Sequence, residues 1–162
     1  MLNSFVASEI GLVHLAFSIL ALVLGSYILF TEKGTAIHRK VGYAYAISML
    51  GLNATALMIY RLNGKFGLFH FFAVWGLFSI TVGVLAAAFR KPAQSWLTFH
   101  YYFMYWSVIG LYAAFGAEMS VRIPKRPFWT MVGVSSGLVS VIGTIIYFKV
   151  KGRWDKLAQL YS

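Results

Sequence analysis

The sequence predicts an all-α integral membrane protein with five transmembrane helices, and three observations support this prediction. The 162 residues are 60% hydrophobic and 11% charged, whereas ordinary soluble domains carry about 25% charged residues. Five apolar stretches each approach the roughly 20 residues that a helix needs to cross the hydrocarbon of a bilayer. Short polar segments separate them, and all three prolines fall in these connections, where a missing N–H does no harm. The whole chain is therefore expected to form a single transmembrane domain.

The predicted spans comprise residues 10–30, 41–60, 66–89, 96–117 and 128–148. The first lacks a basic flank and exceeds the apolar part of a signal peptide, so it is expected to be a retained anchor. Each of the first four spans, or its entry, carries one histidine, and these spans are expected to form a four-helix core. The fifth is expected to be peripheral, and its Gly133-x-x-x-Gly137 pattern predicts a homodimer seam.

Lysine and arginine are unequally divided between the two predicted sides. The side with the N-terminus holds five: Arg61, Lys65, Arg122, Lys125 and Arg126. The other side holds nine: Lys33, Arg39, Lys40, Arg90, Lys91, Lys149, Lys151, Arg153 and Lys156. Cytoplasmic loops carry the excess of basic residues, so the N-terminus is predicted outside and the C-terminus inside. The net charge of +10 then needs no nucleic-acid partner, and the expected partner is the lipid bilayer.

The four histidines alternate between the two predicted sides. His14 and His70 enter spans one and three from the outside, whereas His38 and His100 lie at the inner entries of spans two and four. The surrounding residues suggest a two-helix repeat, with spans one and two echoed by spans three and four. A repeat axis along the membrane normal would bring His14 toward His70 and His38 toward His100.

This pattern favours a membrane-embedded b-type haem protein. Two imidazoles on facing helices can hold a haem iron among apolar and aromatic side chains. One pair in each leaflet would carry electrons across the bilayer, to a redox partner or within a membrane complex. Covalent haem attachment is excluded, because the chain has no cysteine. The arrangement resembles that of the ascorbate-reducible dihaem transmembrane cytochromes, whose ligands also come from alternate helices of a four-helix core.

Two alternatives remain open. In the first, His14, His70 and Glu118 are predicted at similar depth on the outer side, and two imidazoles with one carboxylate suit a Zn²⁺ site. Such a site could support hydrolase activity, and Glu9 is a further carboxylate that could act as the base. The second alternative is a non-catalytic membrane subunit or assembly factor. In that case Glu118 would pair with Arg122, one helical turn away.

The segments "HRKVGYAY", "NGKFG" and "FHYYFMYWSVIGLYAAFGAE…RIP" resemble a family of bacterial predicted membrane proteins of unknown function, over about residues 35–125. This resemblance implies a bacterial cytoplasmic membrane as the location. It also points to seven residues: His38, Arg39, Gly42, Tyr45, His100, Met104 and Arg122. His14 and His70 lie outside the family pattern, and "FHYYFM" replaces a more basic version of its motif.

Overall fold

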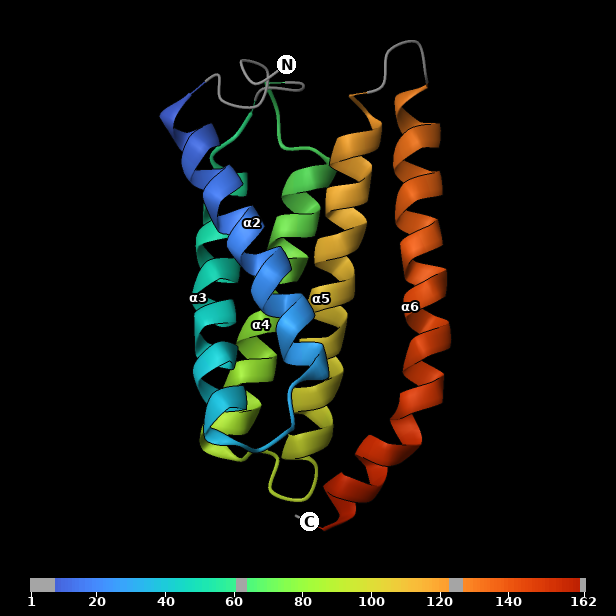
Figure 1. Cartoon of the computed structure of the whole chain (residues 1–162). Coiled ribbons are helices and arrows are strands. Elements are labelled where there is room, and N and C mark those ends of the chain that lie inside the picture. Colours follow the sequence, from blue (N-terminus) through green and yellow to red (C-terminus); the bar gives the residue numbers. More distant parts are fainter. Residues whose placement is uncertain (1–7, 61–63, 123–126, 161–162) are drawn as a thin grey trace. The chain divides into compact units, whose positions relative to one another are not determined.

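The computed structural model describes residues 8–60, 64–122 and 127–160, and within these ranges the chain is all-α (Figure 1). The helices are α2 (Glu9–Phe30), α3 (Ala36–Leu57), α4 (Leu68–Phe89), α5 (Trp96–Ser120) and α6 (Phe128–Gln159). The described residues contain no strand. The all-α class and the five predicted helices are thus confirmed.

Capping side chains explain where the first two helices begin. The Ser8 side chain accepts the N–H of Gly11, and the Thr35 side chain accepts the N–H of His38, each at 3.1 Å. Such caps satisfy amide groups that have no partner inside the helix. Because Thr35 caps α3, that helix begins five residues before the predicted residue 41 and includes His38 in its first turn.

The C-terminal boundary of α6 differs from the prediction. The fifth predicted span ends at residue 148, but α6 continues as far as Gln159. Figure 1 shows the last turns of α6 bending toward α5, and aromatic contacts between Tyr101 and Trp154 hold them there.

Three of the helices are long and apolar enough to cross a membrane: α2, α4 and α6. Among the described helices, α3 and α5 fall outside this group, and α3 carries Arg39 and Lys40 near its start. Arg61, Lys125 and Arg126, which enter the predicted orientation, lie outside the described residues.

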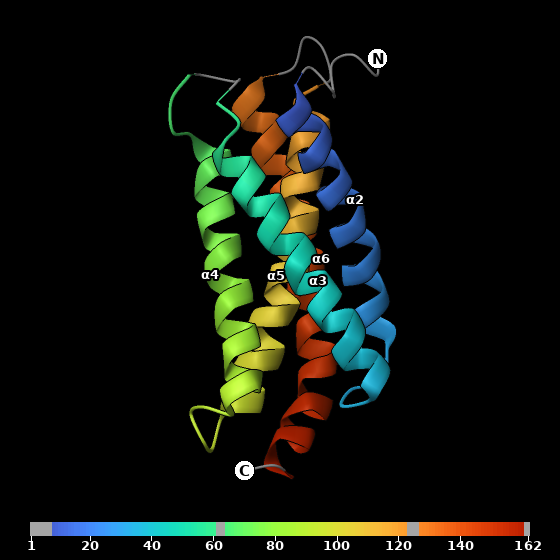
Figure 2. The same ribbon diagram turned by 90° about the vertical axis from the view of Figure 1, so that its left-hand side faces the viewer.

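The chain divides into two compact units, residues 1–80 and 81–162. In the first unit α2 packs along α3 (Figure 2). Glycine permits the close approach, because a Cβ on Gly51 would lie 2.6 Å from the ring of Phe17. Ala21 and Tyr45 are completely buried in this unit.

In the second unit α5 packs along α6. A Cβ on Gly143 would lie 2.7 Å from Ile109, and the Tyr105 hydroxyl donates to the Gly143 carbonyl at 2.6 Å. Nearer the other end, the hydroxyls of Ser120 and Ser135 are 2.5 Å apart. The packing of membrane helices commonly combines small residues with such interhelical hydrogen bonds.

Candidate functional site

His100 lies one turn into α5 and is tethered to α4. Its Nδ1 lies 2.8 Å from the carbonyl oxygen of Gly83. A carbonyl can only accept a hydrogen bond, so we infer that Nδ1 carries the proton and that Nε2 of the neutral ring carries the lone pair. A ligating histidine almost always donates its other N–H in this way. The hydrogen bond therefore restrains the orientation of the His100 imidazole.

Met104 covers the same stretch of α4. A Cβ on Gly83 would lie 2.9 Å from the Met104 sulfur and 3.3 Å from its backbone nitrogen. Glycine at position 83 therefore lets the first turns of α5 approach the α4 backbone closely. This approach brings the Gly83 carbonyl within reach of the imidazole.

His14 has the same tautomer by a different route. Its Nδ1 lies 3.0 Å from the hydroxyl oxygen of Thr55 on α3. That hydroxyl lies 2.8 Å from the carbonyl oxygens of both Gly51 and Leu52, to which it donates. With its single proton so engaged, the Thr55 oxygen accepts from His14, and Nε2 of His14 carries the lone pair.

His70 is arranged in the opposite way. Its Nδ1 accepts the backbone N–H of Gly67 at 3.1 Å, so the neutral ring carries its proton on Nε2. The residue is only 6% exposed, and Nε2 has no hydrogen-bond partner among the described residues. The rings of Tyr60 and Phe66 lie beside the imidazole, with centroid distances of 4.5 and 5.1 Å. In this conformation Nε2 of His70 carries a proton and does not fit a ligand role.

The other residues of the family pattern occupy varied positions on α3 and at the end of α5. His38 is half-buried and Arg39 exposed in the first turn of α3, while Tyr45 is buried two turns on. Arg122 pairs with Glu118 at 2.8 Å, as the non-catalytic alternative expects. Glu118 belongs to the second unit, whereas His14 and His70 belong to the first.

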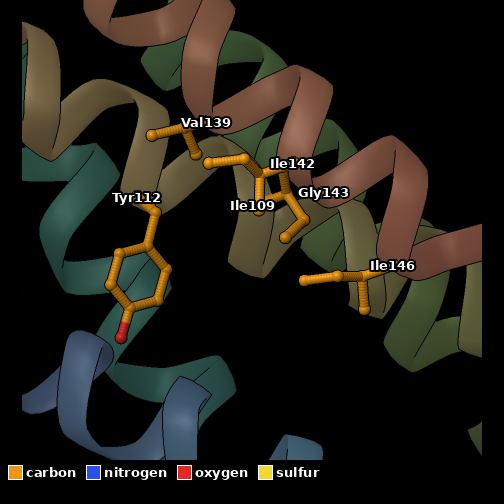
Figure 3. A pocket seen from close by; sticks show the side chains of 6 residues that line it. All are labelled: Ile109, Tyr112, Val139, Ile142, Gly143 and Ile146. Atoms are coloured by element: carbon orange, nitrogen blue, oxygen red, sulfur yellow. The ribbon is translucent and has the colours of Figure 1, made fainter.

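The described residues contain no group of three or more histidine, aspartate or glutamate side chains that could hold a metal ion. A hollow of about 210 Å³ lies between α5 and α6 (Figure 3). Its lining residues are Ile109, Tyr112, Val139, Ile142, Gly143 and Ile146. The Tyr112 hydroxyl points away from the aliphatic side chains. The hollow has an apolar lining and therefore offers no group for acid–base chemistry.

Two further features of the structure could not be predicted from sequence motifs. Thr55 and Gly83 act through a hydroxyl and a carbonyl on neighbouring helices, and no motif marks them. The second feature is an aromatic cluster of α5 and α6: Tyr101, Tyr102, Tyr105, Trp106, Tyr147 and Trp154. Its aromatic residues are apparent in the sequence, but their convergence depends on the continuation of α6.

Comparisons with known proteins agree with the membrane character of the helices. Residues 11–150 match the model of a family described as "Predicted membrane protein (DUF2306)". Searches of the curated proteins and of the solved structures each return no match. The matched region covers most of the 162 residues. The chain therefore belongs to this family of predicted membrane proteins.

Proposed function

We propose that this protein is a b-type haem protein of the bacterial cytoplasmic membrane that carries electrons across or within the bilayer. The observation that supports this most is the tether between His100 Nδ1 and the Gly83 carbonyl. It leaves Nε2 as the nitrogen that can bind iron, and it fixes the plane of the ring. His14 has the equivalent arrangement through Thr55.

In this proposal His100 would hold the haem iron of the predicted inner site, for which the repeat in the sequence predicts His38 as the second ligand. A bound haem would supply a reversible one-electron couple. The protein would supply ligand orientation, because the Gly83 carbonyl restrains rotation of the imidazole. A hydrogen bond to Nδ1–H also raises the basicity of the ligand and lowers the cost of holding it in position.

His14 is the proposed ligand at the outer end. His70 was its expected mate, but Nδ1 of His70 accepts the Gly67 N–H. Ligation through Nε2 would therefore require the ring to leave this hydrogen bond. The inner site is accordingly the better supported of the two, and His70 remains a sequence-based prediction.

The test is the visible spectrum of the purified protein, in the oxidised state and after reduction with dithionite. A six-coordinate b haem is expected to give sharp bands in the reduced-minus-oxidised difference spectrum. Pyridine haemochrome analysis measures the haem-to-protein ratio. A colourless protein, expressed with ample haem supply, would contradict the proposal. If that protein carried stoichiometric zinc, the zinc alternative with His14, His70 and Glu118 would replace it.

The proposal includes five membrane crossings and self-association through α6. Gly133 and Gly137 are exposed, and a Cβ added to either would meet no atom within 4 Å. These glycines leave room for a second copy to approach, as small residues do at helix interfaces in membranes. Gly133→Leu with Gly137→Leu is expected to convert a dimer to a monomer in detergent, measured by light scattering. A molar mass identical to that of the parent would reject the seam.

A further inference from the structure

The end of α6 carries two faces of different character. Taking 100° per residue, Lys149, Arg153 and Lys156 fall within about 60° of the helix circumference. All three are exposed. The opposite face holds Tyr147, which is buried, and Trp154, which packs against Tyr101 and Tyr105. One face of the helix end is thus anchored to α5, and the other presents three cations.

The acidic side chain at this end of α6 is paired with neighbouring side chains. Lys151 donates to one carboxylate oxygen of Asp155, and the Tyr101 hydroxyl donates to the other. Asp155 is the acidic residue of this helix end. Because it is engaged by Lys151 and Tyr101, it does not offset the exposed cations. None of Lys149, Arg153 and Lys156 makes an ion pair with any residue that the structure describes.

Helix length places these cations beyond the apolar part of α6. The helix has 32 residues, so it measures about 48 Å against a hydrocarbon thickness of roughly 30 Å. The apolar part ends at Phe148, and Lys149 follows directly. Leu157 and Leu160, which are 40% and 78% exposed, flank the cationic stripe. A stripe of cations beside exposed leucines suits phosphate groups together with the adjoining glycerol and acyl carbons.

We propose that Lys149, Arg153 and Lys156 form a docking surface for anionic phospholipid headgroups of the adjacent leaflet. Basic clusters that directly follow a membrane span attract anionic lipids with about 1 kcal/mol per cation, which corresponds to roughly fivefold in binding. The contacts of Trp154 with Tyr101 and Tyr105 hold these three cations in place before lipid binds. The surface therefore selects phosphatidylglycerol over zwitterionic phosphatidylcholine, and its occupancy falls as salt rises.

The experiment uses the full chain in micelles that contain equal amounts of phosphatidylglycerol and phosphatidylcholine. Native mass spectrometry counts the lipids of each kind that remain bound. The test variant is Lys149→Gln/Arg153→Gln/Lys156→Gln. The control, Lys40→Gln/Lys65→Gln/Lys91→Gln, removes the same charge from three exposed lysines elsewhere. Thermal unfolding of both variants checks that the fold is intact, as expected for exposed positions.

The parent and the control are expected to retain phosphatidylglycerol preferentially. The test variant is expected to bind it on the order of a hundredfold more weakly, from about fivefold for each of three cations. If the test and control variants lost equal amounts of bound phosphatidylglycerol, the effect would come from the net charge of the protein. That result would overturn the assignment to these three residues. A parent that retains both lipids equally would overturn the proposal altogether.

Discussion

The hydroxyl oxygen of Thr55 accepts a hydrogen bond from Nδ1 of His14, and this contact is directly testable. Thr55→Val keeps the shape of the side chain but removes the acceptor, and it leaves His14 Nδ1–H without this partner. A hydrogen bond of this kind contributes about 0.5–1.5 kcal/mol to stability. Thermal unfolding should show a loss in this range for Thr55→Val and a near-parental midpoint for Thr55→Ser. Equal midpoints for the parent and Thr55→Val would show that the contact contributes nothing.

Asp155 gives a pH-dependent prediction at the same scale. The hydrogen bond from Lys151, and then that from Tyr101, lower the pKa of Asp155 below its ordinary 3.8. A carboxyl group whose pKa is lower in the folded than in the unfolded protein stabilises the fold at pH values above its unfolded-state pKa. This stabilisation is lost as the pH falls through its folded-state pKa. The hydrogen bond to Asp155 raises the pKa of Lys151 above 10.5. The contribution of charged Lys151 to stability is therefore fully present below that pH.

Asp155→Asn removes this charge and should therefore lower the unfolding midpoint at pH 7. The difference from the parent should shrink below pH 4 and vanish once Asp155 is protonated in the folded protein. Tryptophan fluorescence follows the transition, since Trp154 lies in the same cluster. A difference that stays constant from pH 7 to pH 3 would mean that the charge of Asp155 does not stabilise the fold.

At the scale of helices, close contacts at glycine hold each packed pair together. Gly143→Ala would place a Cβ 2.7 Å from Ile109, whose β-branched side chain has little rotameric freedom. Overpacking of this kind costs about 1–3 kcal/mol, partly offset by the better helix propensity of alanine, at about 1 kcal/mol. A net loss of stability is expected in chemical or thermal unfolding.

Gly110→Ala is the matched control on α5, because a Cβ at that exposed position meets no atom within 4 Å. It should be neutral or stabilising. In the double variant Ile109→Ala/Gly143→Ala the clash is absent, so the combined loss should be smaller than the sum of the single losses. Strict additivity would show that the α5–α6 contact is not at these two residues.

The sequence predicted the helices well because apolar length and proline placement are local properties. The i,i+4 spacing also made the pairing of Glu118 with Arg122 predictable, as the non-catalytic alternative expects. The sequence did not predict the continuation of α6, because the residues after Phe148 are too polar for a span. Their helix is stabilised instead by contacts of Trp154 and Asp155 with Tyr101, a residue 53 or more positions away.

The candidate ligands were predictable only as residue types. Sequence periodicity places His14, His70 and His100 on helix faces but does not specify which ring nitrogen is bonded. That depends on the rotation of the neighbouring helix, which brings Thr55 to His14 and Gly83 to His100. It also depends on local backbone before α4, where the Gly67 N–H points at His70.

For the whole molecule, the prediction is a five-crossing topology with the N-terminus outside. The chain has no cysteine, so single cysteines can be introduced without background. Lys65→Cys should react with a membrane-impermeant maleimide in intact cells. Glu32→Cys and Lys91→Cys should react only after permeabilisation. Labelling of Glu32→Cys and Lys65→Cys from the same side would exclude a crossing by α3, and such labelling of Lys65→Cys and Lys91→Cys would exclude one by α4.

The central claim concerns the imidazole of His100, and the most direct measurement is the haem-to-protein ratio of His100→Ala beside the parent, by pyridine haemochrome analysis. Loss of one haem per chain is predicted, with any outer haem retained and with thermal unfolding confirming a folded variant. A folded His100→Ala protein with the parental ratio and an unchanged low-spin spectrum would contradict the account.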